Sequence, residues 1–195
     1  MKIAFIYPAT QIDKKVLPNT LPIGLLYLTS MAEKAYGAQV DVYDSRHGTA
    51  FPGPERLNDY GLIGFSSMSL QVSEALNMAH KARKAGFKGS IAFGGPHASV
   101  APEHLQAQAA VDAIFIGEAE ETFLEYLRYI EGRKHRLSRV WIRKPESGWK
   151  FYPGESFIEN LDSLPFPARE KYGDLPRRLG FINMTTTRGC PFQCR

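Results

Sequence analysis

The sequence predicts an α/β fold built on a sheet of five parallel strands. Short apolar runs alternate with helical patterns through residues 1–132, as in chains whose strands are joined by crossover helices. These runs are nearly continuous, which is typical of strands covered on both faces. The net charge changes from −3 over residues 1–132 to +7 over residues 133–195, which together give the +4 of the chain. We therefore expect a doubly wound sheet, of Rossmann or flavodoxin type, followed by a C-terminal extension.

Five apolar runs define the expected sheet, and small or polar residues dominate the loops that follow them. These loops matter for function, because ligands of open parallel sheets bind beyond the carboxyl ends of the strands. The predicted strands are Lys2–Tyr7, Gln39–Tyr43, Leu62–Ser66, Ser90–Phe93 and Asp112–Ile116.

Three amphipathic patterns predict helices. The first helix is expected over Leu21–Ala35, with Thr20 as its N-cap and Pro22 near its first turn. A second apolar stripe begins at Val72 and is expected to end at Gly86, because glycine is a frequent helix C-cap. We interpret all three stripes as faces packed against the core. The third stripe consists of Phe123, Leu127 and Ile130.

Residues 133–195 follow a different pattern. The stretch RVWIRKPESGWKFYP predicts a β-hairpin around a Pro-Glu-Ser-Gly turn. The proline-punctuated stretch NLDSLPFPAREKYGDLP predicts a linker that lies across a surface. FINMTTT is expected to be a new strand, the first of a further domain. We accordingly divide the chain into an α/β domain (residues 1–132), a hairpin and linker (133–180) and the start of another domain (181–195).

Composition excludes several classes of protein. No run approaches the roughly 20 apolar residues of a membrane-spanning helix, and the N-terminal MKIAFIYP lacks the apolar region of a secretory signal. We therefore expect a cytoplasmic protein without a membrane partner. The only two cysteines, Cys190 and Cys194, are too few for a disulfide scaffold, so they are expected to be reactive, metal-binding or incidental.

The loops also exclude several ligands. The chain has neither a G-x-G-x-x-G dinucleotide motif nor a phosphate-binding P-loop. The first strand ends in Tyr-Pro-Ala-Thr-Gln, which lacks the glycines and hydroxyls of a flavin mononucleotide site and the acidic cluster of a phospho-receiver.

Gly94 and Gly95, directly after the fourth strand, are the strongest remaining signal. Two glycines let a bulky ligand approach the backbone, although a tight turn alone explains them as well. Ser66 and Ser67 supply hydroxyls to a ligand or, alternatively, cap the helix that follows. The acidic residues Glu118, Glu120 and Glu121 are favoured by the dipole of the helix that they begin, whatever the function.

Six segments, in this order and spacing, resemble the cobalamin-binding class of radical S-adenosylmethionine enzymes: LPIGLLYLTSMAE, GFSSMS, FGGPHASVAPEHL, VDAIFIGEAEETFLEYL, NLDSLPFPARE and TTTRGCPFQC. The resemblance spans nearly the whole chain, and RGCPFQC is its most specific part. It implies that Cys190 and Cys194 begin a C-x-x-x-C-x-x-C motif, whose thiolates hold a [4Fe–4S] cluster with one iron open to S-adenosylmethionine. The third cysteine falls at position 197, so we expect the sequence to be cut inside the cluster-binding loop of a radical domain.

The resemblance also implies a cobalamin site at the strand ends. Gly94 and Gly95 let the nucleotide tail pass close to the backbone, and Ser66 or Ser67 hydrogen-bonds its benzimidazole or ribose. Asp44 begins Asp-Ser-Arg-His-Gly, which departs from the D-x-H-x-x-G of proteins that ligate cobalt through histidine. We therefore interpret His47 as an exposed loop residue. The other implied cofactor contacts are Pro8, Leu21, Pro22, Gly24, Asp44, Met68, Pro96, His97, Gly117 and Glu118.

The resemblance implies the cobalamin-binding part of a radical S-adenosylmethionine methyltransferase that acts on unactivated carbon. This part alone is not expected to be catalytic, and its expected partners are cobalamin and the radical domain. Two alternatives stay open: a cyclase or oxidoreductase of the same class, and a stand-alone flavodoxin-like module that carries cobalamin or binds another nucleotide. Arg177, Arg178 and Arg188 belong to no nucleic-acid recognition motif, and we interpret them as a solvated linker face or a surface against the radical barrel.

Overall fold

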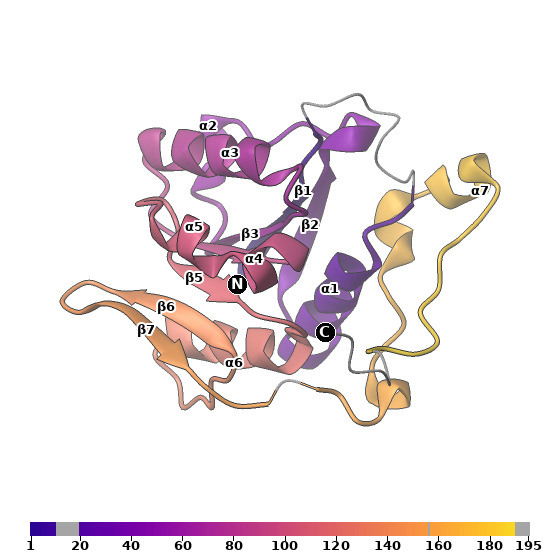
Figure 1. The fold of residues 1–195 in the computed structure, drawn as a ribbon. Coiled ribbons are helices and arrows are strands. Elements are labelled where there is room, and N and C mark those ends of the chain that lie inside the picture. The colour runs from indigo at the N-terminus through magenta and orange to yellow at the C-terminus, as the bar shows by residue number, and fades with distance from the viewer. Residues whose placement is uncertain (11–19, 156, 190–195) are drawn as a thin grey trace.

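The computed structural model describes residues 1–10, 20–155 and 157–189. Its sheet has seven strands in the order β2-β1-β3-β4-β5-β6-β7 (Figure 1). The first five strands are parallel, and each lies within one residue of its predicted bounds. The α/β fold predicted from the sequence is therefore confirmed. The strands are β1 (Lys2–Tyr7), β2 (Gln39–Asp44), β3 (Leu62–Ser66), β4 (Ser90–Gly94), β5 (Ala113–Phe115), β6 (Val140–Lys144) and β7 (Gly148–Tyr152).

Helices cover both faces of the sheet (Figure 1). One face packs against α1 (Ile23–Tyr36) and α6 (Glu120–Ile130). The opposite face packs against α3 (Val72–Lys84) and the short helices α4 (Pro96–Val100) and α5 (Pro102–Gln106). Because the sheet is covered twice, its strands are apolar on both sides, as the sequence pattern indicated. The other short elements are α2 (Pro54–Leu57), α7 (Leu175–Leu179) and the 3₁₀ turns η1 (Ser45–His47), η2 (Leu161–Ser163) and η3 (Arg169–Tyr172).

The ends of the helices differ in detail from the expected caps. Helix α1 begins two residues later than predicted, after Pro22, and no side chain caps it, so the expectation of Thr20 as N-cap is wrong. The expected role of Gly86 fits better: it adopts a left-handed φ of 89° just beyond α3, and its amide donates to the carbonyl of Arg83 at 3.0 Å. Only a residue that tolerates positive φ closes this turn without strain.

The predicted hairpin is present, but it is part of the main sheet. Strand β6 pairs antiparallel with β5, placing Ile142 beside Ala113, and β7 pairs antiparallel with β6. The prediction of a five-stranded sheet with a separate hairpin is therefore corrected to seven strands. The physical reason is that β5 would otherwise be an open edge, whereas Val140 and Ile142 of β6 join the same buried core.

The linker lies across α1 and β2, as expected. The amide of Ala168 donates to the carbonyl of Leu26 at 3.1 Å. The ammonium of Lys171 lies 2.5 Å from the carboxylate of Glu33 and 2.9 Å from the carbonyl of Val40. These contacts, made by residues distant in sequence, fix the linker on the edge of the sheet (Figure 1).

Residues 181–187 do not form the strand that FINMTTT predicted. The side-chain amide of Asn183 donates instead to the carbonyl of Leu21 at 2.9 Å, so this segment is attached to the start of a helix and not to a neighbouring strand. No helix of the described residues is long and apolar enough to cross a membrane.

Candidate functional site

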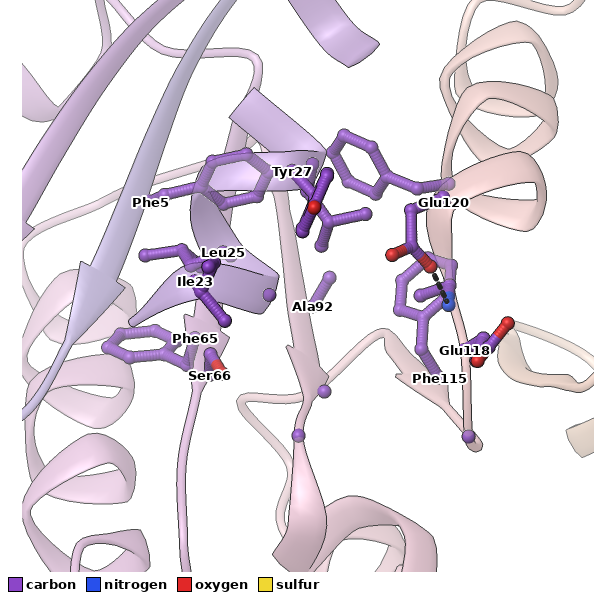
Figure 2. A pocket seen from close by; sticks show the side chains of 18 of the residues that line it. Phe5, Ile23, Leu25, Tyr27, Phe65, Ser66, Ala92, Phe115, Glu118 and Glu120 are labelled. Carbon is purple, nitrogen blue, oxygen red and sulfur yellow. Dashed lines mark hydrogen bonds between the residues drawn. The ribbon is translucent and has the colours of Figure 1, made fainter. Parts of the chain in front are cut away.

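A pocket opens at the carboxyl ends of the parallel strands, between the sheet and helices α1 and α6 (Figure 2). Its floor is a trough of small residues that lie side by side on neighbouring strands. Gly64 of β3 pairs with Ala92 of β4, and two residues further along the same strands Ser66 pairs with Gly94. Larger side chains at these positions would fill the space, so the trough exists because three of the four residues have at most a methyl group.

Aromatic rings border this trough. The ring of Phe5 packs so close to Gly64 that a Cβ there would lie only 2.7 Å from a ring carbon. Over Gly94 there is more room, because a Cβ at that position would meet only the Cβ of Phe115, at 3.8 Å. The resulting cavity has a volume of about 280 Å³. Tyr27 of α1, labelled in Figure 2, lines its helical side. Phe123 of α6 lines the same side.

Gly95 has a different role from Gly94. It adopts a φ of 90°, and a Cβ there would lie 3.0 Å from the amide nitrogen of Ser67 and 3.1 Å from its carbonyl oxygen. The two loops are also hydrogen-bonded, since the amide of Ser67 donates to the carbonyl of Gly94 at 3.2 Å. Gly95 is thus required for the tight turn, while Gly94 leaves space in the pocket.

Charged groups lie at the edge of the pocket nearest α6. Arg188 comes from the C-terminal segment, and its guanidinium lies 2.6 Å from Glu120 and 3.5 Å from Glu118. The opposite carboxylate oxygen of Glu118 accepts a 3.1 Å hydrogen bond from the amide of Ile158. The carboxylates at the start of α6 therefore bind the linker and the tail, beyond any favourable interaction with the helix dipole.

Six of the predicted cofactor contacts line this pocket. They are Gly24, Ser66, Gly94, Gly95, Gly117 and Glu118. The other eight lie elsewhere: Pro8, Leu21, Pro22, Asp44, Ser67, Met68, Pro96 and His97. Cys190 and Cys194, the predicted metal ligands, are outside the described residues. Within those residues, no group of three His, Cys, Asp or Glu side chains is arranged to hold a metal ion.

Several residues outside the pocket have identifiable partners, whereas the buried hydroxyl of Ser67 has no hydrogen-bond partner among the described residues. Gln71, buried before α3, joins two loops: its side chain donates to the carbonyl of Pro8 at 2.6 Å and accepts from the amide of Met68 at 2.9 Å. The alternative reading of Ser66 and Ser67 as caps is wrong, because α3 begins only at Val72. Leu21 packs in a small apolar cluster with residues of α1 and α7.

His97 is buried on the α3 side of the sheet. One ring nitrogen lies 3.0 Å from the hydroxyl of Ser69, and the other lies 3.0 Å from a ring nitrogen of His104. Burial lowers the pKa of His97 below its ordinary value of 6.5, and the neighbouring imidazole of His104 lowers it further. The neutral form of His97 is therefore favoured, and its ring contacts Ser69 and His104 instead of the pocket.

Asp44, at the end of β2, is fully engaged. Only 1% exposed, it accepts hydrogen bonds from Arg46 and from the hydroxyl of Tyr172, the latter at 2.8 Å. His47 is also largely covered, with its side chain 16% exposed and its ring edge-on to that of Tyr172. The expectation that His47 is an exposed loop residue is wrong, because the docked linker covers it.

Most of the pocket lining was not predicted from the sequence, since six of its 21 residues were named as cofactor contacts. Gly64 and Ala92 carried a usable signal, as small residues inside otherwise bulky apolar runs. Arg188 is not part of a solvated face, because its side chain is only 19% exposed and ion-paired; the alternative of a surface against the radical barrel stays a prediction. Other lining residues that the sequence did not indicate are Phe5, Tyr27, Phe115, Glu120, Phe123 and Thr185.

The chain is similar to known proteins over all or most of its length. A family model described as the B12 binding domain matches residues 12–127. The chain is 26% identical, over all of its length and 44% of the relative's, to an uncharacterized methyltransferase of Pyrococcus horikoshii. It is 28% identical, over 99% of its length and 47% of the relative's, to cytidylyl-2-hydroxyethylphosphonate methyltransferase of Streptomyces wedmorensis. The chain thus spans less than half the length of these relatives.

A solved structure gives the same fold. The cobalamin-dependent S-adenosylmethionine radical enzyme OxsB, with aqua-cobalamin and S-adenosylmethionine bound, matches with a TM-score of 0.77 at 18% identity. The match covers 97% of this chain and 27% of OxsB. Because the family model covers more than half of the chain, the chain belongs to the B12-binding domain family, as a domain that resembles those of cobalamin-dependent radical S-adenosylmethionine methyltransferases.

Proposed function

We propose that the pocket between the sheet, α1 and α6 receives the nucleotide tail of cobalamin. The observation that carries this proposal is the trough formed by Gly64, Ala92 and Gly94, which leaves a slot beside the sheet. The cavity of about 280 Å³ is slightly smaller than typical small-molecule pockets, which measure roughly 300–1,000 Å³. It therefore suits a flat base and its ribose, and the much larger corrin would lie outside, over the strand ends.

The lining fits such a tail chemically. The floor is apolar and aromatic, as a benzimidazole ring requires, and the Ser66 hydroxyl at its open end is available to hydrogen-bond a ring nitrogen or a ribose hydroxyl. Gly24 and Gly117 present backbone without side chains at the rim, where a corrin edge would pass. When bound, cobalamin supplies a cobalt centre that can carry a methyl group, and the chain's own residues bind and orient it.

The whole protein, in this proposal, is a radical S-adenosylmethionine methyltransferase that acts on unactivated carbon. Residues 1–132 form the cobalamin domain, 133–180 the hairpin and linker, and 181–195 the start of the radical domain, where Cys190 and Cys194 bind a [4Fe–4S] cluster. The names and lengths of the two methyltransferase relatives support this assignment. Large apolar side chains near the C-terminal end offer a surface for the remainder of the radical domain, namely Phe166, Phe181, Ile182 and Met184, which are 49–84% exposed.

Retention of hydroxocobalamin tests the binding proposal. The purified chain is mixed with the cofactor and passed over a gel-filtration column, and the corrin absorption of the protein peak is recorded. Wild type should retain the colour. Gly94→Leu should elute colourless, because its side chain fills the slot without needing a positive φ, whereas the matched surface variant Ala35→Leu should bind like wild type. Equal retention by Gly94→Leu would place the cofactor elsewhere.

The assignment of the whole protein needs a longer chain that includes the third cysteine. After anaerobic reconstitution with iron and sulfide, this protein should show the spectrum of a [4Fe–4S] cluster and cleave S-adenosylmethionine to 5′-deoxyadenosine. Cys190→Ala should abolish both while leaving cobalamin retention intact. A cluster that persists in Cys190→Ala would remove this cysteine from the ligand set.

A further inference from the structure

The segment from Asn183 to Arg188 crosses from the start of α1 to the start of α6, the two helices that wall the pocket. At one end, the Asn183 side chain donates to the carbonyl of Leu21 at 2.9 Å, and its own carbonyl accepts from Arg169 at 2.9 Å. Between its ends, Thr185 lines the pocket, as does Arg188 at the far end. Figure 1 shows this yellow segment returning from α7 toward α1. We call residues 183–188 the strap.

Arg188 holds the α6 end of the strap. Its guanidinium lies 2.6 Å from Glu120 and 3.5 Å from Glu118, and 5.1 Å from the ring centre of Tyr27 on α1. Glu120 is only 5% exposed and also accepts from the amide of Ala119, so its position is fixed. Burial lowers the pKa of Arg188, but the two carboxylates more than offset this and raise it above its ordinary value. The arginine therefore stays charged and paired at any physiological pH.

The remainder of the strap is weakly held. Met184, Thr186 and Thr187 are exposed, and among the described contacts only Asn183 and Arg188 donate to the α/β domain from this segment. Segments with few buried contacts open locally at low free energy. Separating a partly buried charge pair costs more free energy, because the partner that stays behind is left without its counter-charge. Opening of the strap at its α6 end should thus depend on Arg188, while Asn183 holds the other end.

We propose that the strap closes the mouth of the cofactor pocket and that Arg188 is the catch that keeps it closed. This inference rests on the proposed function of the pocket. The tail of the cofactor passes into or out of the slot only while Arg188 is released from Glu118 and Glu120. Arg188 is thus a positioning residue, which sets the rate of cofactor exchange and adds little to the affinity.

The rates of cobalamin exchange test this role. Stopped-flow absorption with hydroxocobalamin gives the association rate, and displacement gives the dissociation rate. Arg188→Gln should raise both rates by at least about tenfold and change Kd little. The reason is that a hydrogen bond between charged groups contributes more than the roughly 1.4 kcal/mol that corresponds to a tenfold change in rate. Glu120→Gln, which keeps the size and the acceptor, should act in the same direction. The control is Arg178→Gln, whose partner Asp174 is 74% exposed, and it should match wild type.

Hydrogen exchange of the cofactor-free protein gives a second readout. Arg188→Gln should speed amide exchange over residues 183–188 without changing exchange in β1, β3 or β4. If wild type binds no cobalamin, the proposed function of the pocket fails while this measurement still tests the catch. If wild type binds cobalamin and Arg188→Gln leaves exchange and both rates unchanged, the strap is overturned. A rise in the dissociation rate alone would also overturn it, since that would make Arg188 a cofactor contact.

Discussion

The hydroxyl of Tyr172 donates a 2.8 Å hydrogen bond to the carboxylate of Asp44, joining the C-terminal linker to the end of β2. The same carboxylate, 1% exposed, pairs with the guanidinium of Arg46. Asp44 therefore anchors the linker; the family resemblance implies a cofactor contact for this residue, but it does not line the pocket. An anchored linker in turn holds the start of the strap near the pocket.

Tyr172→Phe should weaken this anchor. Burial raises the pKa of Tyr172, and the adjacent carboxylate of Asp44 raises it further, so the hydroxyl remains a proton donor. Losing a hydrogen bond to a charged acceptor should reduce the free energy of unfolding by about 1.5–3 kcal/mol, because the buried carboxylate of Asp44 loses one of its donors. Urea denaturation followed by circular dichroism measures the change. A variant as stable as wild type would show that the contact does not hold the linker.

Gly64→Ala should destabilise the domain by about 1–3 kcal/mol, because the new methyl group would lie 2.7 Å from the ring of Phe5. Phe5→Leu removes the ring edge and should relieve the clash. In a double-mutant cycle, the two substitutions together should therefore cost less than the sum of their separate effects. Strict additivity of the two unfolding free energies would contradict the close packing of these residues.

Arg143 tests the attachment of the hairpin. Its guanidinium donates to the carbonyls of Val111, Gln106 and Gln108 at 2.8–3.1 Å and lies over the ring of Trp149. Arg143→Ala should lower the free energy of unfolding by about 2–3 kcal/mol, since it removes three hydrogen bonds made by a charged donor. Arg143→Lys should restore only part of this, because an ammonium cannot reproduce the planar fork. Wild-type stability of Arg143→Lys would show that the positive charge alone accounts for the contribution of Arg143 to the free energy of unfolding.

The depressed pKa of His97 makes stability depend on pH. In the folded state His97 resists protonation because it is buried and next to His104. Stability is therefore complete above the unfolded pKa of about 6.5 and is lost as pH falls through 6.5 toward the lower folded value. Urea midpoints should drop between pH 7.5 and 5.5 in wild type and drop less in His97→Gln. Exposed His135 supplies the control His135→Gln, and a wild-type slope in His97→Gln would remove His97 as the cause.

Local patterns predicted the strands and the three long helices, because continuous apolar runs and helical stripes record burial directly. Gly95 was equally readable, since a positive φ after a strand favours glycine. The trough was harder to predict: Gly64 and Ala92 stand out as small residues in their own strands, but only the register of β3 and β4 places them side by side. Arg188 had no local signal, since its partners lie far back in the sequence. The hairpin was predicted because its two strands are adjacent in sequence. Its pairing with β5 was not predicted, because that contact joins residues distant in sequence.

The most direct test of the central claim compares cobalamin with cobinamide, which has the same corrin and lacks the nucleotide tail. Calorimetric titration of the folded chain should show that hydroxocobalamin binds with at least tenfold higher affinity than cobinamide, and that Gly94→Leu removes this difference. Such a result would place the tail in the slot above Gly94. Equal affinities for the two corrinoids would contradict the account, because the slot would then contribute nothing to binding.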